Sequence, residues 1–401
     1  MISVMATASR IIDVDAHVEP APGWLDEFPD LAARLPEKFP DTDPRFAMGT
    51  AEMFAWFVSD DLLRHAPPDQ RMPIDRLVNP AIEFLFTEEA KGLTFAGADQ
   101  HAPLVDPAAR VAWLDAQGIE KQNLITGGGY TLARAIADPG LGRDALEAVN
   151  TWMTDAVGEH RDRLLPVTCL RFDDIDWAVG ELKRMRERGS RAFLISSEPA
   201  GGIAPSSPAF DPVWGAATEL GMVPLLHIGM SPAMIHPGWA NTDDPALIRL
   251  LSILQPEQSA EVFLSAMIIG GAFERHPTLT VLISELGIDW LPRLARRLDS
   301  FATEGASPLV LGEYTLPLLP SEYIGRNVRI SPLPAPHQSP LRLMEHLPGV
   351  AVFSSDFPHF EGSGEPLPYY ESLLADVDDE TRDGFLGGSI AEAYDRMGDP
   401  M

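Results

Sequence analysis

The sequence predicts a single (β/α)8 barrel over residues 1–401. Eight short apolar runs recur along the chain, and helix-like patterns separate most of them. The runs are continuous rather than alternating, which is typical of parallel strands buried on both faces. A length of 401 residues is normal for one such barrel with insertions. A doubly wound open sheet is the alternative, but no Gly-x-Gly-x-x-Gly follows the first run, which excludes its usual nucleotide-binding form.

The predicted elements alternate along the chain. Strands are expected within 11–20 and at 122–126, 164–170, 191–195, 222–227, 279–285, 327–331 and 350–356. Helices are expected at 108–117, 144–160, 177–188, 212–220, 245–254, 260–276 and 291–301, followed by a helical tail at 369–397. Gly118 and Gly221 are suitable helix stop signals, and Gly387-Gly388 predicts a break in the tail.

Residues 20–107 interrupt this pattern after the first strand. The segment is rich in proline and aromatic residues, and a purely disordered linker would not carry so many aromatics. We expect an ordered insertion within the single domain, with helices near 53–64. It would form either a cap over the site or a subunit interface, and its aromatic residues suggest an apolar or aromatic substrate.

The composition restricts the partners and the compartment. A formal charge of -29, from 30 basic and 59 acidic residues, argues against nucleic acid or an anionic membrane as a partner. Cys169 is the one cysteine and is expected in the core, which fits a reducing compartment. No signal-peptide pattern opens the chain, and the longest apolar run, 266–273, is too short to span a bilayer. We expect a cytoplasmic homodimer that acts on a small molecule.

Titratable residues stand at the ends of several predicted strands. In the first strand, Asp13, Asp15 and His17 alternate with apolar residues and would share one face. The fifth, sixth and eighth strands end in His227, Glu285 and Asp356. Each has a simpler explanation alone: a core histidine, a helix-entry residue and a turn cap. Together they favour a divalent metal site at the barrel mouth, with Zn, Mn or Fe suiting these ligands.

Six motifs occur in order across nearly the whole chain. They are Asp13-Val14-Asp15-Ala16-His17, Phe210-Asp211-Pro212-Val213-Trp214, Leu225-Leu226-His227, the run 271–277, the run 285–292, and Ser355-Asp356-Phe357-Pro358-His359. With these motifs the sequence resembles the amidohydrolase superfamily, specifically its amidohydrolase-2 branch, which includes relatives of aminocarboxymuconate-semialdehyde decarboxylase. The resemblance implies a distorted TIM barrel that binds a divalent metal.

The resemblance also implies the ligands. The first-strand His-x-His pair of the family corresponds to Asp15 and His17, so aspartate replaces the first histidine. The strand-five histidine and the strand-eight aspartate correspond to His227 and Asp356, and Glu285 stands at a strand-six position that is often histidine.

The lysine that bridges two metals in other members has no match at 192–197, although Glu198 lies just beyond. This favours one ion. Two ions remain the alternative, with Glu285 and Glu198 as candidate ligands of the second.

The leading interpretation is a metal-dependent hydrolase of an amide, ester or thioester. The ion would lower the pKa of a water molecule, Asp356 would accept its proton, and Glu285 or His359 would protonate the leaving group. The alternative is a metal-dependent non-oxidative decarboxylase of an aromatic or enoic acid, in which an acid protonates the substrate carbon. A non-catalytic metal-binding protein is the third interpretation.

Overall fold

A curled, all-parallel sheet lies at the centre of the chain. The computed structural model describes residues 10–18, 24–35, 106–126, 138–228, 255, 257–304, 314–334, 338–357 and 365–401. The seven strands are β1 (Ile12–Asp13), β2 (Lys121–Leu124), β3 (Leu164–Thr168), β4 (Ala192–Leu194), β5 (Val223–His227), β6 (Val281–Ser284) and β7 (Val328–Ile330). They pair in chain order, β1 to β7, and each neighbouring pair is parallel. Sequential order favours a barrel, because a doubly wound sheet reverses its strand order at a switch point.

The eighth predicted strand is an extended segment that makes only isolated bridges. Ala351 forms a parallel bridge with Ile330 of β7, and Phe357 forms one with Ala16, just beyond β1. On the β1 side, the Val14 N–H also donates to the Phe353 carbonyl at 3.2 Å. The segment 350–357 therefore pairs with both edges of the seven-stranded sheet, and the arrangement is TIM-barrel-like.

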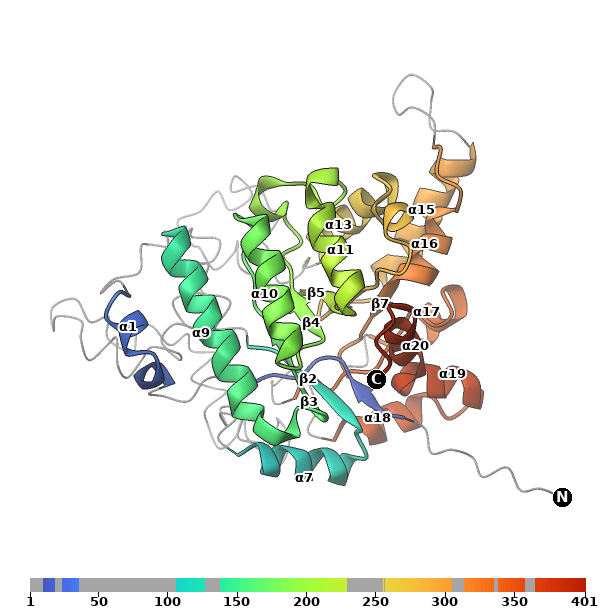
Figure 1. Cartoon of the computed structure of the whole chain (residues 1–401). Helices are drawn as coiled ribbons and strands as arrows, with labels where there is room; N and C mark the ends of the chain where they lie inside the picture. The colour runs from blue at the N-terminus through green and yellow to red at the C-terminus, as the bar shows by residue number, and fades with distance from the viewer. Residues whose placement is uncertain are drawn as a thin grey trace, which may run out of the picture.

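Helices cover the outer face of the sheet (Figure 1). They are α7 (Pro107–Gln117), α9 (Pro139–Val157), α10 (Ile175–Glu187), α11 (Asp211–Leu220), α13 (Glu257–Ile269), α14 (Ala272–Arg275), α15 (Trp290–Glu304), α16 (Pro320–Asn327) and α17 (Leu341–His346). Single turns of 3-10 helix lie at η2 (Gly158–His160), η3 (Ala200–Gly202) and η4 (Pro208–Phe210). The helix expected at 260–276 is two helices, α13 and α14. The helix is interrupted at Gly270 and Gly271, between α13 and α14. Gly270 also packs closely against Ser206, because a Cβ at position 270 would lie 2.2 Å from the Ser206 Cβ.

Helix ends follow the local sequence. The side chains of Asp106, Asp138 and Asp174 each accept a hydrogen bond from a backbone N–H in the first turn of α7, α9 and α10. Gly118 and Gly221 end α7 and α11 in the left-handed conformation, as their sequence positions predict.

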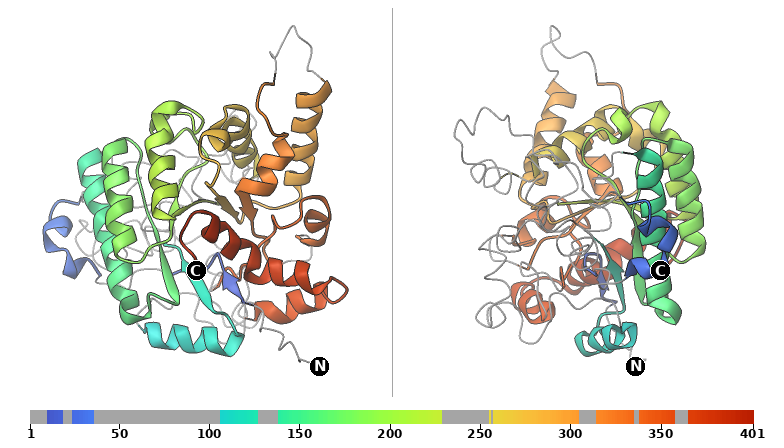
Figure 2. Two further views of the ribbon diagram at one scale, coloured as in Figure 1. Left: turned by 45° about the vertical axis from the view of Figure 1, so that its right-hand side comes forward. Right: turned by 90° about the vertical axis from the view of Figure 1, so that its left-hand side faces the viewer.

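The C-terminal elements lie near β1 (Figure 2). They are α18 (Pro366–Leu373), α19 (Asp379–Asp383), η6 (Gly384–Gly388) and α20 (Ser389–Arg396). Ile390 and Tyr394 of α20 belong to one buried cluster with strand residues such as Leu225. Gly387 of η6 packs against the backbone that precedes β1. A glycine is required there, because a Cβ would lie 2.5 Å from the Arg10 carbonyl oxygen. Cys169 lies in the same cluster and is buried, as expected.

Only part of the expected insertion at 20–107 is described. It comprises η1 (Trp24–Glu27) and α1 (Pro29–Ala32), whose Trp24, Leu25 and Leu31 join the main core. The rest of the insertion, with the helices predicted near 53–64, lies outside the described residues, as does the helix predicted at 245–254. Across the described ranges, none of the helices has the length and apolar character needed to cross a membrane.

Candidate metal site

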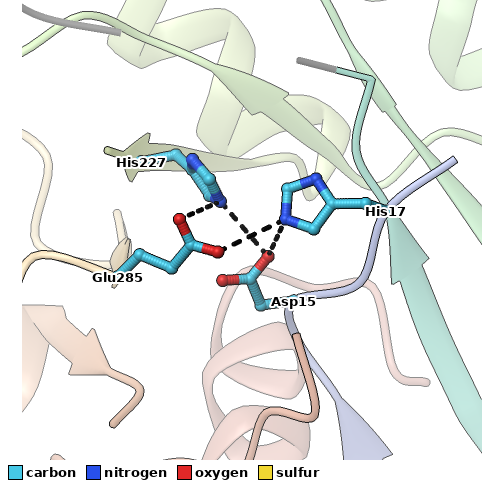
Figure 3. Close-up of side chains that lie close together, drawn as sticks. All are labelled: Asp15, His17, His227 and Glu285. Carbon is cyan, nitrogen blue, oxygen red and sulfur yellow. Dashed lines mark ion pairs between the residues drawn. The ribbon is translucent and has the colours of Figure 1, made fainter. Parts of the chain in front are cut away.

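Four buried side chains converge at the carboxyl ends of the strands. Asp15, His17, His227 and Glu285 each offer one ligand atom, and these atoms all lie within 4.8 Å of one another. Figure 3 shows the four side chains pointing towards a common centre. The His17 Nε2 is 3.4 Å from the Asp15 Oδ1 and 3.5 Å from the Glu285 Oε1. The His227 Nε2 is 3.4 Å from the Asp15 Oδ1 and 3.4 Å from the Glu285 Oε2.

The backbone around the first and eighth segments fixes Asp15 and His17. The Asp15 carbonyl accepts a hydrogen bond from the Asp356 N–H at 2.8 Å, and the His17 N–H donates to the Phe357 carbonyl at 2.7 Å. On the other side, His17 forms a parallel bridge with Ile125, which follows β2. His17 is therefore held by pairing on both sides, and Asp15 is held by the eighth segment.

His227 is the last residue of β5, and its ring is held by its own backbone neighbour. The His227 Nδ1 lies 2.8 Å from the Ile228 carbonyl oxygen. Because a carbonyl can only accept, this contact places a proton on Nδ1 in the neutral ring and leaves the Nε2 lone pair facing the group. This is the tautomer that a metal-ligating histidine needs.

Two site residues have a left-handed backbone. Glu285 follows β6 with φ 58°, and Asp356 has φ 54°; they are the two non-glycine residues with positive φ in the described part of the chain. This conformation costs an ordinary L-residue roughly 1–2 kcal/mol. Such outliers cluster at functional sites, where the surrounding structure holds them in place.

The donor set fits one divalent cation. Both Asp15 carboxylate oxygens and the His227 Nε2 are buried, and no described residue gives them a hydrogen bond of normal geometry. Tetrahedral donors about 2.1 Å from a cation lie about 3.4 Å apart. Each of the two imidazole Nε2 atoms lies 3.4–3.5 Å from an Asp15 oxygen and from a Glu285 oxygen, and all four ligand atoms lie within 4.8 Å of one another. Two imidazole nitrogens and two carboxylates are a ligand set that Zn, Mn and Fe accept.

The raised pKa values of His17 and His227 indicate that the two carboxylates of the group favour a positive charge between them. Burial lowers the pKa of His17, but the close approach and the negative charges of Asp15 and Glu285 outweigh it and raise this pKa to about 9. Burial also opposes protonation of His227, yet the charges of Glu285 and Asp15 hold its pKa well above its ordinary value. A divalent ion would take over this role, because metal binding requires the neutral imidazoles and releases their protons.

Asp356 borders the group without being one of its four members. It is fully buried, and its Oδ1 lies 3.2 Å from the His17 Nε2. Glu198, four residues beyond the end of β4, is half-buried and is not in the group. His359 lies outside the described residues. The structure therefore brings together five of the seven predicted site residues.

Asp13 has a different role from the one its alternation with Asp15 and His17 suggested. Its carboxylate accepts hydrogen bonds from the Ser355 N–H at 2.9 Å, the Ser355 hydroxyl at 2.6 Å and the Gln122 side-chain amide at 2.7 Å. Burial raises the pKa of Asp13 to about 6, although these hydrogen bonds oppose the shift. Asp13 thus connects β1, β2 and the eighth segment, and it is not in the four-residue group.

Fold and site together define a TIM-barrel-like α/β protein with a buried metal-binding group. The family model described as amidohydrolase (Amidohydro_2) matches residues 94–396, which is more than half of the chain. The chain therefore belongs to the amidohydrolase-2 family, as its motifs predict.

Solved structures with the same fold match nearly the whole chain. An amidohydrolase from Mycobacterium avium subsp. paratuberculosis is 21% identical with a TM-score of 0.67, covering 97% of this chain and 100% of that one. A 5-carboxyvanillate decarboxylase from Sphingomonas paucimobilis is 19% identical with a TM-score of 0.63, and the match covers 97% of this chain and 99% of that one. A dihydroxybenzoic acid decarboxylase from Polaromonas was solved with bound manganese and the inhibitor 2-nitroresorcinol. It is 17% identical with a TM-score of 0.60, and the match covers 96% of this chain and 97% of that one. No curated protein matches the sequence.

Proposed function

We propose that the chain is a metal-dependent, non-oxidative decarboxylase of a hydroxylated aromatic acid. The observation that carries the proposal is the buried group of two imidazoles and two carboxylates, with Asp356 3.2 Å from His17 beside it. Proteins that share this fold are named as decarboxylases of 5-carboxyvanillate and of dihydroxybenzoic acid. The hydrolase interpretation has only the family name in its favour, so the decarboxylase alternative is the better supported of the two.

Asp15, His17, His227 and Glu285 would hold one divalent ion. We propose manganese, because the Polaromonas decarboxylase contains it and because the mixed nitrogen and oxygen ligands suit it. When bound, the ion would supply positive charge that attracts the carboxylate and phenolic oxygens of the substrate. The compact four-atom group favours one ion, since two-metal sites place their ions about 3.5–4 Å apart and need further bridging donors.

Asp356 would be the proton donor. In its protonated form it can transfer a proton to the ring carbon that bears the substrate carboxylate, and π electrons of the ring form the new C–H bond. The C–C bond to the carboxylate then breaks, its electron pair restores the aromatic ring, and CO2 leaves. Asp356 is left as a carboxylate and regains its proton from solvent. The step consumes no oxidant and no water.

An isotope experiment separates decarboxylation from hydrolysis. Purified protein loaded with Mn²⁺ would be incubated in D2O with 5-carboxyvanillate, 2,6-dihydroxybenzoate and related hydroxylated aromatic acids. We expect release of one CO2 and incorporation of one deuterium at the carbon that lost the carboxylate, both abolished by a chelator and restored by Mn²⁺. We also expect 2-nitroresorcinol to inhibit the reaction.

A parallel panel of aryl esters, amides and thioesters in H2¹⁸O provides the opposing test. Incorporation of ¹⁸O into the acid product, with no CO2 released from any aromatic acid, would establish the hydrolase alternative and refute the decarboxylase.

A further inference from the structure

Arg110 contacts the metal site from its outer side. It lies on α7, half-buried, and its guanidinium Nη2 donates to the His17 carbonyl at 3.2 Å and to the Phe357 carbonyl at 3.3 Å. Those carbonyls belong to a member of the four-residue group and to the residue that follows Asp356. One nitrogen thus bridges the first and eighth segments where they meet.

Two aromatic rings hold the guanidinium in this place. Its central carbon lies 4.5 Å from the centroid of the Phe357 ring and 5.7 Å from that of Trp113. The two rings stack on each other with centroids 4.2 Å apart and an interplanar angle of 19°. Cation–π contacts of this kind favour the charged form and fix its orientation.

The remaining guanidinium contact extends to the first strand. The Arg110 Nε donates to the Gln122 side-chain oxygen at 2.7 Å, and the Gln122 amide nitrogen donates to the Asp13 carboxylate at 2.7 Å. Asp13 in turn accepts from the Ser355 N–H and hydroxyl. A continuous chain of polar contacts therefore runs from α7 through β2 and β1 to the residue that precedes Asp356.

We propose that Arg110 is a positioning residue, which bridges the carbonyls of His17 and Phe357 and so sets the alignment of His17 with Asp356. It acts through these residues and contacts none of the four ligand-capable side chains. The inference rests on the proposed metal site and adds a residue outside it. Arginine suits this role because its planar fork offers several donors in fixed directions, whereas lysine offers a single point charge.

Arg163 provides a matched control. It also donates to two backbone carbonyls, those of Glu120 at 2.5 Å and Ile119 at 3.0 Å, and to the Asp115 carboxylate at 2.7 Å. These residues precede β2, at the end of the sheet away from the four-residue group. A substitution there removes a comparable set of hydrogen bonds without affecting the alignment of His17.

The test compares Arg110→Met, Arg110→Lys and Arg163→Met in the full-length protein after the metal has been stripped with a chelator. The dissociation constant for Mn²⁺, the visible spectrum of the Co²⁺-loaded protein and the metal-free melting temperature would be measured for each. We expect Arg110→Met to weaken Mn²⁺ binding roughly 10–100-fold, the usual effect of losing an outer partner of a metal ligand, and to change the Co²⁺ spectrum. The Mn²⁺ dissociation constant of Arg110→Lys should lie between those of Arg110→Met and the natural protein. Arg163→Met should lower the melting temperature but leave the Mn²⁺ constant within about twofold.

Each outcome decides the inference. An unchanged Mn²⁺ dissociation constant and Co²⁺ spectrum in Arg110→Met would overturn it. Equal weakening of Mn²⁺ binding in Arg163→Met would also overturn it, because it would show that a general loss of stability is responsible. If Arg110→Met does not fold, Arg110→Lys is judged by the same criteria. Failure of the natural protein to bind Mn²⁺ would overturn the proposed metal site and this inference with it, whereas normal binding by the natural protein and by Arg110→Met would overturn this inference alone.

Discussion

Replacing Asp356 by asparagine tests whether this residue is the proton donor. Asn has nearly the same shape as Asp and tolerates the left-handed φ of 54°. The substitution removes the transferable proton and leaves an amide in the same buried position. The expected loss in turnover is about 10²–10⁴, the usual contribution of general acid–base catalysis.

The structure also predicts what this substitution leaves unchanged. Asp356 is not among the four clustered ligand atoms, so Mn²⁺ content should remain close to that of the natural protein. The backbone hydrogen bond from Asp356 N–H to the Asp15 carbonyl does not depend on the side chain, and the fold should persist. The free energy of unfolding should therefore change by no more than about 1 kcal/mol, as for a substitution that retains shape and backbone conformation.

The assay combines turnover, metal analysis and thermal unfolding, with Asp15→Asn as the control. Asp15→Asn alters a member of the group and should reduce turnover and metal content together. A metal-replete Asp356→Asn enzyme with full turnover would refute the proton-donor role. Loss of metal equal to that of Asp15→Asn would show that Asp356 is itself a ligand.

Three other predictions concern the ligand set, the pH dependence and the barrel end. Glu285→Gln should weaken Mn²⁺ binding measured by titration, because Glu285 is in the four-residue group; unchanged affinity would remove it from the ligand set. The pKa of His17 is raised from 6.5 to about 9 without metal, so its contribution to stability is complete below pH 6.5 and is lost as pH rises through 9. The melting temperature of chelator-treated protein should therefore fall over that interval while Mn²⁺ affinity rises; the opposite trends would contradict these charge states. Gly387→Ala should destabilise the fold by about 1–3 kcal/mol in denaturant unfolding, because its Cβ would meet the Arg10 carbonyl oxygen, and it should leave Mn²⁺ affinity unaltered.

The sequence could predict the barrel and the meeting of the strand ends because both follow from local patterns. Continuous apolar runs indicate buried parallel strands, and a polar residue at the end of such a run lies at the barrel mouth. His227 and Glu285 were found in this way, on strands that pair directly. The helices α16 and α17 were missed because they are only 8 and 6 residues long and so show little periodicity.

Features that depend on distant contacts left no local signal. The positive φ at Glu285 and Asp356 is imposed by the surrounding structure, since neither is a residue that adopts it freely in the way that glycine does. The role of Asp13 depends on Ser355, which is 342 residues away in sequence. Alternation along one strand indicated that Asp13 faces the same side as Asp15, but only the structure shows which partners occupy that side.

Assembly of the site and closure of the barrel are the same event in this fold. The contacts that join the eighth segment to the first are the Asp356 N–H to the Asp15 carbonyl, the His17 N–H to the Phe357 carbonyl, and the Ser355 side chain to Asp13. Each involves a site residue or its immediate neighbour, so the chain cannot bring Asp15, His17 and Asp356 together without pairing its two edges. A ligand that binds the assembled site and not the unfolded chain stabilises the folded state by RT ln(1 + [L]/Kd). A divalent ion held by Asp15 and His17 would therefore stabilise the pairing of the two segments as well as the site, and loosening the junction between them would weaken both together.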